Sequence, residues 1–414
     1  MATALARPQM ISLAAGFTDS QTLPVSETRR LLEGILGRGT TARAALQYGT
    51  TQGDAELRRL VAQRLADLDA AAWGAIGSGP LPERVYAAER MFITSGSQQL
   101  LYVLSECLCD PGAIVLVEDP TYFVYLGIAQ SHGLRCRGIR LTEEGLDVEH
   151  LRRVLEGLQR SGELSRVKLL YLVSYHQNPT GTTTAWERKR EALAVLRHFE
   201  SAAGHPIYLV EDAAYRELRF AGLDVPSALA APRARERVIY AGTFSKPFAT
   251  GVRVGFGVLP DRLLRVVLRV KGNHDFGTSN LIQQLLRRAL ADGTFERHVE
   301  VLRARYARKA RTMVQALRRH FPEGVRWVEP RGGLYVWARL PGSLRTGMSS
   351  ALFREALAHN VLYIPGGLCY APDSTRRRPD HEMRLSFGSA SLEDIREGIA
   401  RLGATVAGVS GRRR

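Results

Sequence analysis

The chain has 414 residues, 45% of them apolar and 24% charged, and a formal net charge of +16. This length and composition can support a large buried core and predict two domains. No run approaches the roughly eighteen apolar residues of a membrane span, and the N-terminal MATALARPQM has no apolar core of signal-peptide length. We therefore expect a soluble protein that stays in the cytoplasm and does not bind membranes.

The cysteines and the charge exclude further classes. No CxxC pair or disulfide-like framework occurs among the four cysteines, which fits a reducing compartment and predicts no metal site. The excess of 57 basic over 41 acidic residues raises the question of nucleic acid. Most of it is arginine spread along the chain, and its densest segment, from Val301, has the spacing of a solvated amphipathic helix. No helix-turn-helix or zinc-finger pattern accompanies it, so we expect no nucleic-acid partner and assign the charge no role.

Short β-rich runs alternate with helical patterns along the middle of the chain. In order, the runs are MFITS (91–95), AIVLVE (113–118), LLYLVS (169–174), IYLVED (207–212), VIYAG (238–242) and VGFGVL (254–259). Between them, segments such as 98–108 and 186–202 place apolar residues three and four positions apart, which predicts helices. Repeated strand and helix predict an α/β domain whose parallel sheet is covered on both faces.

The end of the chain has a different pattern. After a long helical stretch, GGLYVWARLP (332–341) and EMRLSFGSAS (382–391) are strand-like runs among helices, which favour a smaller α+β domain. We expect a large domain over 46–290, a small domain over 291–414, and an N-terminal segment, 1–45, that joins the small domain. The arginine runs at 376–378 and 412–414 are predicted to be a loop and a frayed tail.

Residues just after each strand are the candidates for a binding site, because ligands bind at the carboxyl ends of parallel strands. The turn 95–99 opens a helix, whose N-terminal N–H groups suit a phosphate, although serine and glutamine also merely cap helices. Tyr122 follows the second strand and fits either a planar ligand or the core. Asn178 lies in an NPTG turn, and its amide either faces the same cleft or belongs to a plain turn.

Asp212 ends an otherwise apolar strand. A buried carboxylate is costly unless it meets a cation or several donors, so Asp212 needs a partner. The alternatives are a ligand, a helix cap and an ion pair with a nearby arginine.

A single lysine lies in YAGTFSKPFATGVRVGFGV (240–258), just past the next strand. Burial and the positive charge of Arg253 would lower the pKa of Lys246 and make it a nucleophilic amine toward a carbonyl. Thr243, Ser245 and Arg253 together suit a phosphate dianion. A lysine, a phosphate cradle, an aromatic ring and a buried acid indicate pyridoxal 5'-phosphate, with the lysine as Schiff base.

At this point the chain resembles the class I/II aminotransferases of fold type I over nearly its whole length. The motifs, in the family order, are LQYGTTQGDAELR from Leu46, TSGSQQ from Thr94, EDPTYF from Glu118, QNPTG from Gln177, EDAAY from Glu211, GTFSKPFATGVRVG from Gly242 and MRLSFGSAS from Met383. SGSQQ and VEDPTYF look most like the branch of 2-aminoadipate and kynurenine aminotransferases and the effector domains of related regulators. The resemblance implies a large domain with a mostly parallel sheet between helices and a smaller α+β domain.

The resemblance also implies roles for the cofactor-binding residues. Lys246 would form the Schiff base and move the proton between the substrate's α-carbon and the cofactor. Asp212 would keep the pyridine nitrogen protonated, Tyr122 would stack on the ring, and Asn178 and Tyr215 would bind its phenolic oxygen. The phosphate would be held by Ser97, Gln98, Thr243, Ser245 and Arg253.

Substrate and partner residues follow from the same resemblance. Arg384 would clamp the substrate's α-carboxylate, with Asn178 and Gly16 beside it. Tyr48 would reach the phosphate in the neighbouring subunit, which implies a homodimer with shared active sites. His274 and Asp275 receive no role beyond a surface or dimer contact. Thr250, where the family often has proline, and Pro247, which follows the lysine, depart from the family pattern without removing a catalytic group.

Three functional hypotheses result. The first is an aminotransferase of amino-acid metabolism that moves an amino group from an L-amino acid to a 2-oxo acid in a ping-pong cycle. The branch suggests 2-aminoadipate or an aromatic donor with 2-oxoglutarate. The second is another pyridoxal-phosphate enzyme, such as an oxidase, lyase or cyclase, because a fold and a cofactor do not fix the reaction. The third, a non-catalytic effector-sensing domain, is disfavoured because about ten residues precede ISLAAGF where the regulators carry a DNA-binding domain.

Overall fold

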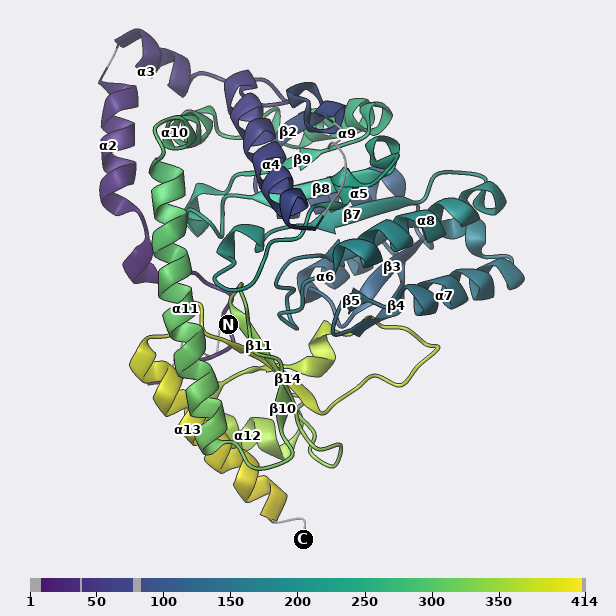
Figure 1. Ribbon diagram of the computed structural model, residues 1–414, viewed down its shortest axis with the longest axis vertical. Coiled ribbons are helices and arrows are strands. Elements are labelled where there is room, and N and C mark those ends of the chain that lie inside the picture. Colours follow the sequence, from purple (N-terminus) through teal and green to yellow (C-terminus); the bar gives the residue numbers. More distant parts are fainter. Residues whose placement is uncertain (1–8, 38, 77–82, 412–414) are drawn as a thin grey trace.

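The computed structural model describes residues 9–37, 39–76 and 83–411, so the arginine run at 412–414 lies outside the described residues. Its largest element is an eight-stranded sheet of order β2-β9-β8-β7-β6-β3-β4-β5 (Figure 1). The strands are β2 (Met91–Thr94), β3 (Ile114–Asp119), β4 (Arg135–Thr142), β5 (Gly145–Leu146), β6 (Val167–Val173), β7 (Tyr208–Asp212), β8 (Val238–Thr243) and β9 (Gly255–Val258).

The central strands of this sheet are parallel. β4, β3, β6, β7 and β8 pair in parallel, whereas β9 runs antiparallel to both β2 and β8, and β5 runs antiparallel to β4. The register aligns Asp212 with Val173 on one side and with Ala241 on the other. The carboxyl ends of β6, β7 and β8 therefore lie at one level. All six predicted runs are strands of this sheet, and the mostly parallel α/β architecture is confirmed.

The strand residues alternate between two cores. Val115 and Val117 of β3 belong to the core on one face, and Ile114 and Leu116 to the core on the other. Burial on both faces explains why these strands are continuous apolar runs in the sequence. One face is covered by α5 (Ser97–Leu108), α6 (Phe123–Ser131) and α9 (Asp261–Asp275), and the other by α4 (Ala55–Ile76), α7 (Val148–Arg160), α8 (Trp186–Ala203) and α10 (Asn280–Ala291).

A second sheet lies below the first in Figure 1. Its antiparallel strands have the order β10-β11-β14-β13 and are β10 (Arg326–Trp327), β11 (Tyr335–Arg339), β14 (Glu382–Ser386) and β13 (Ile364–Pro365). Helices α12 (Ala351–Ala358) and α13 (Leu392–Gly411) pack together beside it. Near the N-terminus, β1 (Ile11–Ser12) pairs in parallel with β12 (Val361–Leu362), while α2 (Val25–Leu36) and α3 (Gly39–Leu46) pack on α10. The domain boundaries at 45 and 290 stay predictions.

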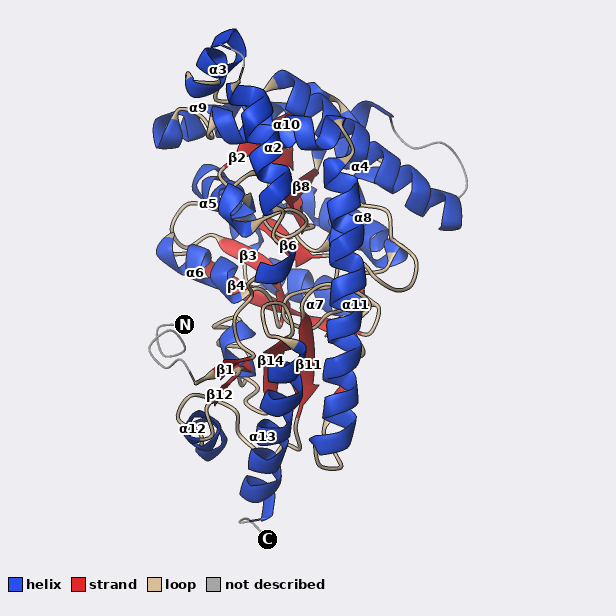
Figure 2. Ribbon diagram, turned by 90° about the vertical axis from the view of Figure 1, so that its left-hand side faces the viewer, coloured by secondary structure: helices blue, strands red, loops and turns tan. Residues whose placement is uncertain are grey.

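Helix α11 (Thr294–His320) runs along both sheets and contacts α10 at one end and α13 at the other (Figures 1 and 2). Leu302, Tyr306 and Met313 on its apolar face are buried, as the amphipathic pattern predicts. Lys309, however, is fully buried rather than solvated. Its Nζ lies 2.8 Å from an Asp19 carboxylate oxygen and donates to the Gly388 carbonyl, which the helical spacing alone did not reveal.

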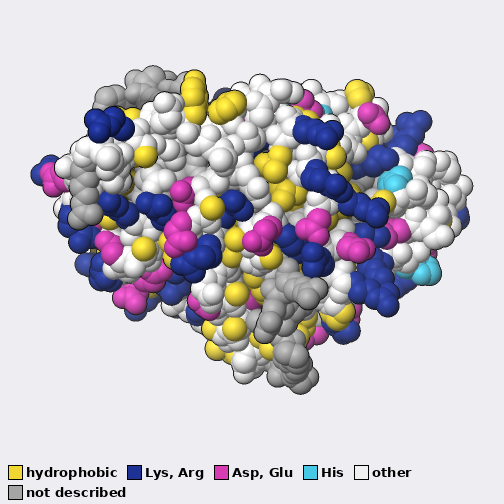
Figure 3. Space-filling view, turned by 90° about the horizontal axis from the view of Figure 1, so that it is seen from above, with side chains coloured by type: hydrophobic (Ala, Val, Ile, Leu, Met, Phe, Trp, Pro, Cys, Tyr) yellow, Lys and Arg dark blue, Asp and Glu magenta, His cyan; other side chains and the backbone are white. Residues whose placement is uncertain are grey.

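The surface in Figure 3 carries basic side chains interspersed with acidic ones. The predicted loop at 376–378 is a loop, and Arg376 forms an ion pair with Asp119 at the end of β3. No helix among the described residues is long and apolar enough to cross a membrane. The described part of the chain also contains no cluster of three or more His, Cys, Asp or Glu side chains that would suit a metal ion.

Candidate active site

A cavity of about 110 Å³ opens at the carboxyl ends of β6, β7 and β8. Its lining residues are Ser97, Gln98, Tyr122, Val173, Asn178, Asp212, Ala214, Tyr215, Thr243, Ser245, Lys246, Thr250 and Arg253. The structure thus brings together the residues expected to hold the cofactor's ring and phosphate within one chain. Their convergence follows from the parallel strands, whose carboxyl ends meet at one edge of the sheet.

Lys246 lies three residues after β8 and is largely buried. Its Nζ donates a hydrogen bond to the Gly16 carbonyl at 2.8 Å. Burial lowers the pKa of Lys246; Tyr335 opposes this shift, and the charges of Arg384 and Arg253 reinforce it. The side chain is therefore more readily a neutral, nucleophilic amine than a solvated lysine is.

The chain has five lysines, which makes the surroundings of Lys246 distinctive. Three of the others, Lys189, Lys271 and Lys309, are fully buried side chains that each pair with a carboxylate. Lys246 has no carboxylate partner among the described residues, so its amine is not committed to an ion pair.

Asp212, the last residue of β7, is buried without a cation. The Tyr171 hydroxyl donates to its Oδ2 at 2.8 Å and the Ala214 N–H to its Oδ1 at 3.1 Å. Burial raises the pKa of Asp212 to about 6, against these two hydrogen bonds. Within the described residues Asp212 has no ion-pair partner, so the alternative of an arginine pair does not apply.

The cavity lining also includes Arg253, which suits an anion. Gly96, with φ of 79°, immediately precedes α5, and a Cβ there would lie 2.9 Å from Arg253 Nη2. Arg253 itself adopts a left-handed conformation with φ of 49°, and its Nη1 donates to Ser245 Oγ at 3.2 Å. Its guanidinium has no carboxylate partner in the described chain. The glycine lets this guanidinium approach the helix N-terminus, where N–H groups favour a phosphate.

Arg384, on β14, faces the same region from the second sheet. Its Nη1 donates to Asn178 Oδ1 and its Nη2 to the Ala14 carbonyl, both at 2.7 Å. Only 2% of the residue is exposed, and its buried Nε has no hydrogen-bond partner among the residues that the structure describes. All its hydrogen-bond partners among the described residues are neutral oxygens, which leaves the charge available to a ligand carboxylate.

Two residues near this site were not predicted. Tyr335, on β11, lies with its hydroxyl 3.0 Å from that of Tyr215 and its ring 4.3 Å below the Arg384 guanidinium. The Ala14 carbonyl enters the site because β1 pairs with β12. No local signal in the sequence distinguishes Tyr335 from a core tyrosine, since its position depends on the register of β11 with β14.

Tyr48 does not lie in the cavity of its own chain. It is 79% exposed, and its ring packs edge-on against Phe276 at 5.2 Å. Its expected role in a partner's site stays a prediction.

Asp275 contacts the turn 95–99 at the start of α5. Its carboxylate accepts hydrogen bonds from Gln99 Nε2 at 2.8 Å and from the buried Lys271 Nζ at 2.7 Å. His274 instead contacts Glu106 at 2.9 Å. Asp275 therefore stabilises the turn 95–99, a contact that was not predicted from the sequence.

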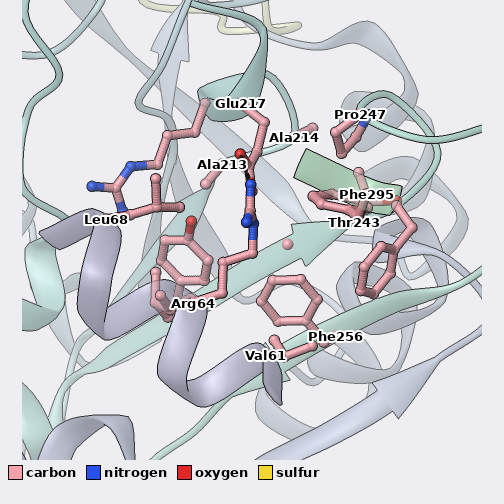
Figure 4. Close-up of a pocket in the computed structure, with 15 residues that line it drawn as sticks. Val61, Arg64, Leu68, Ala213, Ala214, Glu217, Thr243, Pro247, Phe256 and Phe295 are labelled. Carbon is pink, nitrogen blue, oxygen red and sulfur yellow. Dashed lines mark hydrogen bonds and ion pairs between the residues drawn. The ribbon is translucent and has the colours of Figure 1, made fainter. Parts of the chain in front are cut away.

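A smaller cavity of about 30 Å³ is lined in part by residues of β8 (Figure 4). Val61, Phe256 and Phe295 give it an apolar wall, and Arg64 is tied to Glu217 at 2.7 Å. This volume has room for roughly one or two water molecules. The cavity that holds Lys246 is the candidate active site because Asp212, Lys246 and Arg253 meet there.

The arrangement fits pyridoxal phosphate. A carboxylate without a cation suits a protonated pyridine nitrogen, an arginine without an anion suits the phosphate, and an amine without a carboxylate partner in the described chain suits the aldehyde. On an α/β sheet of this topology, these features define a pyridoxal-phosphate enzyme of fold type I.

The comparisons with known proteins identify the family. The chain belongs to the aminotransferase class I and II family, whose model matches residues 8–402. It is 34% identical over 405 residues to the 2-aminoadipate transaminase of Thermus thermophilus, covering 97% of this chain and 91% of that protein. The protein is therefore a pyridoxal-phosphate-dependent aminotransferase, as the sequence predicted.

Solved structures agree with this assignment. The kynurenine aminotransferase of Pyrococcus horikoshii, solved with PMP, is 32% identical with a TM-score of 0.85 over 97% of this chain and 91% of that one. The multiple substrate aminotransferase of Thermococcus profundus is 29% identical with a TM-score of 0.87 over 99% and 94%. The predicted fold, cofactor and family branch are confirmed.

Proposed function

We propose that the protein transfers the amino group of an L-amino acid to a 2-oxo acid, with Lys246 as the residue that binds the cofactor covalently and moves the proton. The observation that carries this proposal is the Lys246 amine, which has no carboxylate partner among the described residues and lies in one cavity with Asp212 and Arg253, neither of which forms an ion pair there. Pyridoxal phosphate, when bound, supplies a ring that withdraws electrons from the substrate's α-carbon.

The chain's own residues would hold the cofactor at both ends. Asp212 would accept a hydrogen bond from the pyridine nitrogen, with its carboxylate oriented by Tyr171 and Ala214. Tyr122 would lie against the ring, and Asn178 and Tyr215 would bind its phenolic oxygen. The phosphate would be bound by Ser97, Gln98, Thr243, Ser245 and Arg253.

The substrate would be oriented by Arg384 and deprotonated by Lys246. The guanidinium fork would bind the α-carboxylate and so fix the Cα–H bond relative to Nζ of Lys246. The lowered pKa of Lys246 favours the neutral amine that accepts this proton. Gly16, whose carbonyl contacts Nζ, belongs to a segment that would shield the site from water.

The assembly we propose is a homodimer in the cytoplasm. Leu46, Tyr48 and Phe276 are large apolar side chains that are 68%, 79% and 56% exposed, which supports burial against a second copy. The four cysteines are free, in keeping with a reducing compartment. For the donor we propose 2-aminoadipate or an aromatic amino acid, and for the acceptor 2-oxoglutarate.

Borohydride reduction followed by peptide mapping tests the role of Lys246. Reduction should attach the cofactor permanently to the tryptic peptide 238–253, which contains only this lysine. Lys168 serves as an internal control for non-specific labelling, because it is only partly buried and its Nζ has no carboxylate partner among the described residues, lying instead near the Ser165 carbonyl and His205 Nε2. Attachment at Lys168 or at any other lysine would contradict the proposal.

A further inference from the structure

Tyr335 contacts both Tyr215, which lines the cofactor cavity, and Arg384, which would bind the substrate. The proposed mechanism gives it no role. The residue is 2% exposed, its hydroxyl lies 3.0 Å from that of Tyr215, and its ring lies under the Arg384 guanidinium. β11 pairs antiparallel with β14 so that Tyr335 lies opposite Ser386. Tyr335 and Arg384 are therefore diagonal neighbours on one face of the small sheet.

The direction of the hydrogen bond between the two hydroxyls follows from proton counting. Burial raises the pKa of Tyr215 well above its usual value, so Tyr215 keeps its single hydroxyl proton. In the proposed function this proton goes to the cofactor's phenolic oxygen. Tyr335 must then donate to Tyr215, whose oxygen also accepts from Asn178 Nδ2 at 3.5 Å.

A hydroxyl that accepts a hydrogen bond becomes a stronger donor, because hydrogen bonds in a chain polarise one another. A stronger bond from Tyr215 draws negative charge away from the phenolic oxygen. That charge would otherwise favour a proton on the neighbouring nitrogen that joins Lys246 to the cofactor.

We propose that Tyr335 is a positioning residue that acts through Tyr215 and keeps the nitrogen between Lys246 and the cofactor unprotonated at neutral pH. This inference rests on the proposed roles of Lys246 and Tyr215. The amine of an incoming amino acid is protonated at neutral pH. An unprotonated nitrogen at the site can take up this proton when the amine displaces Lys246.

The space around the Tyr335 hydroxyl supports a specific role. A Cβ at residue 16 would lie 2.6 Å from this oxygen, so the hydroxyl fits only because Gly16 has no side chain. The carbonyl of the same glycine accepts the hydrogen bond from Lys246. Gly16 of the N-terminal segment therefore leaves room for the Tyr335 hydroxyl and also contacts Lys246.

The test is a pH titration of the holoenzyme's visible absorption. Tyr335→Phe should move the titration midpoint of the Lys246-bound cofactor upward by about 0.5 pH unit, the scale of one lost hydrogen bond. Tyr363→Phe is the matched control, because it removes another buried hydroxyl, which donates to the Thr346 carbonyl outside the cavity. Its midpoint should equal that of the unaltered protein.

A double variant separates action through Tyr215 from direct action. In a Tyr215→Phe background, adding Tyr335→Phe should cause no further shift. An unchanged midpoint in Tyr335→Phe, or the same shift in both backgrounds, would overturn the inference while leaving the proposed function intact. If the unaltered protein shows no absorption band from cofactor bound to Lys246, the proposed function itself is refuted, and this inference with it.

Discussion

Replacing Arg384 tests how the site recognises an amino acid. The buried guanidinium donates to Asn178 Oδ1 and to the Ala14 carbonyl, each at 2.7 Å, and its Nε has no hydrogen-bond partner within the described chain. Arg384→Ala removes the cation that, in our proposal, binds the substrate's α-carboxylate. The amino acid would then lose both its anchor and its orientation relative to Lys246.

The hydrogen bonds of Arg384 set the rough size of the binding free energy that the variant should lose. A hydrogen bond to a charged group contributes about 1.5–3 kcal/mol, and a guanidinium fork makes two such bonds. The guanidinium already donates to two neutral oxygens. We therefore expect the net loss of binding free energy to lie toward the lower end of the range for two such bonds, about 3–4 kcal/mol. At 1.36 kcal/mol per factor of ten, kcat/KM should fall roughly 10²- to 10³-fold, mainly through a higher KM. Arg384→Lys keeps the charge without the fork and should lose less.

Steady-state kinetics with a paired substrate set would measure this effect. We would compare an amino-acid donor with the amine that has the same side chain but no carboxylate, since only the amino acid should be penalised in Arg384→Ala. Arg339→Ala is a control on the neighbouring strand, because the Arg339 side chain is 63% exposed and pairs with Glu382. An unchanged KM in Arg384→Ala, or an equal loss for both substrates, would refute the reasoning.

Three further predictions address the cofactor, the turn at the start of α5 and the buried Glu118. Lys246→Ala should abolish turnover but retain cofactor through its phosphate, as judged by absorption after gel filtration; full activity would refute its role. Asp275→Ala leaves Lys271 unpaired and should weaken cofactor binding roughly fivefold in equilibrium dialysis; unchanged affinity would show that the turn needs no brace. Burial raises the pKa of Glu118 from 4.5 to about 8, so the folded chain holds this proton more tightly than the unfolded chain does. The cofactor-free protein should therefore lose stability as the pH rises through this range, and less steeply in Glu118→Gln; identical melting-temperature profiles would contradict this.

The strands were predictable where burial on both faces produces a continuous apolar run. β4 was missed because its sequence, RCRGIRLT, places arginines between apolar residues, and Arg137 is held there by Asp373 from a distant loop. The antiparallel direction of β9 was also beyond prediction, since strand direction depends on the chain path and not on the local pattern. The alternation of strands and helices was enough for the fold class.

The site was predictable where residues follow strand ends. Asp212 and Lys246 converge because β7 and β8 are adjacent and parallel. Tyr335 and the Ala14 carbonyl reach the site through the second sheet and the pairing of β1 with β12, which no local motif encodes. The sequence also could not show that Lys189, Lys271 and Lys309 are committed to carboxylates, whereas Lys246 has no such partner in the described part of the chain.

The most direct test of the account is the half-reaction in a spectrophotometer. The purified holoenzyme would receive amino acids one at a time, including 2-aminoadipate and aromatic donors, and then 2-oxoglutarate. We predict that a donor bleaches the absorption of the Lys246-bound cofactor, releases one 2-oxo acid per site, and that 2-oxoglutarate restores the spectrum. A spectrum that no amino acid bleaches, or bleaching that consumes oxygen and is not reversed by a 2-oxo acid, would contradict the account.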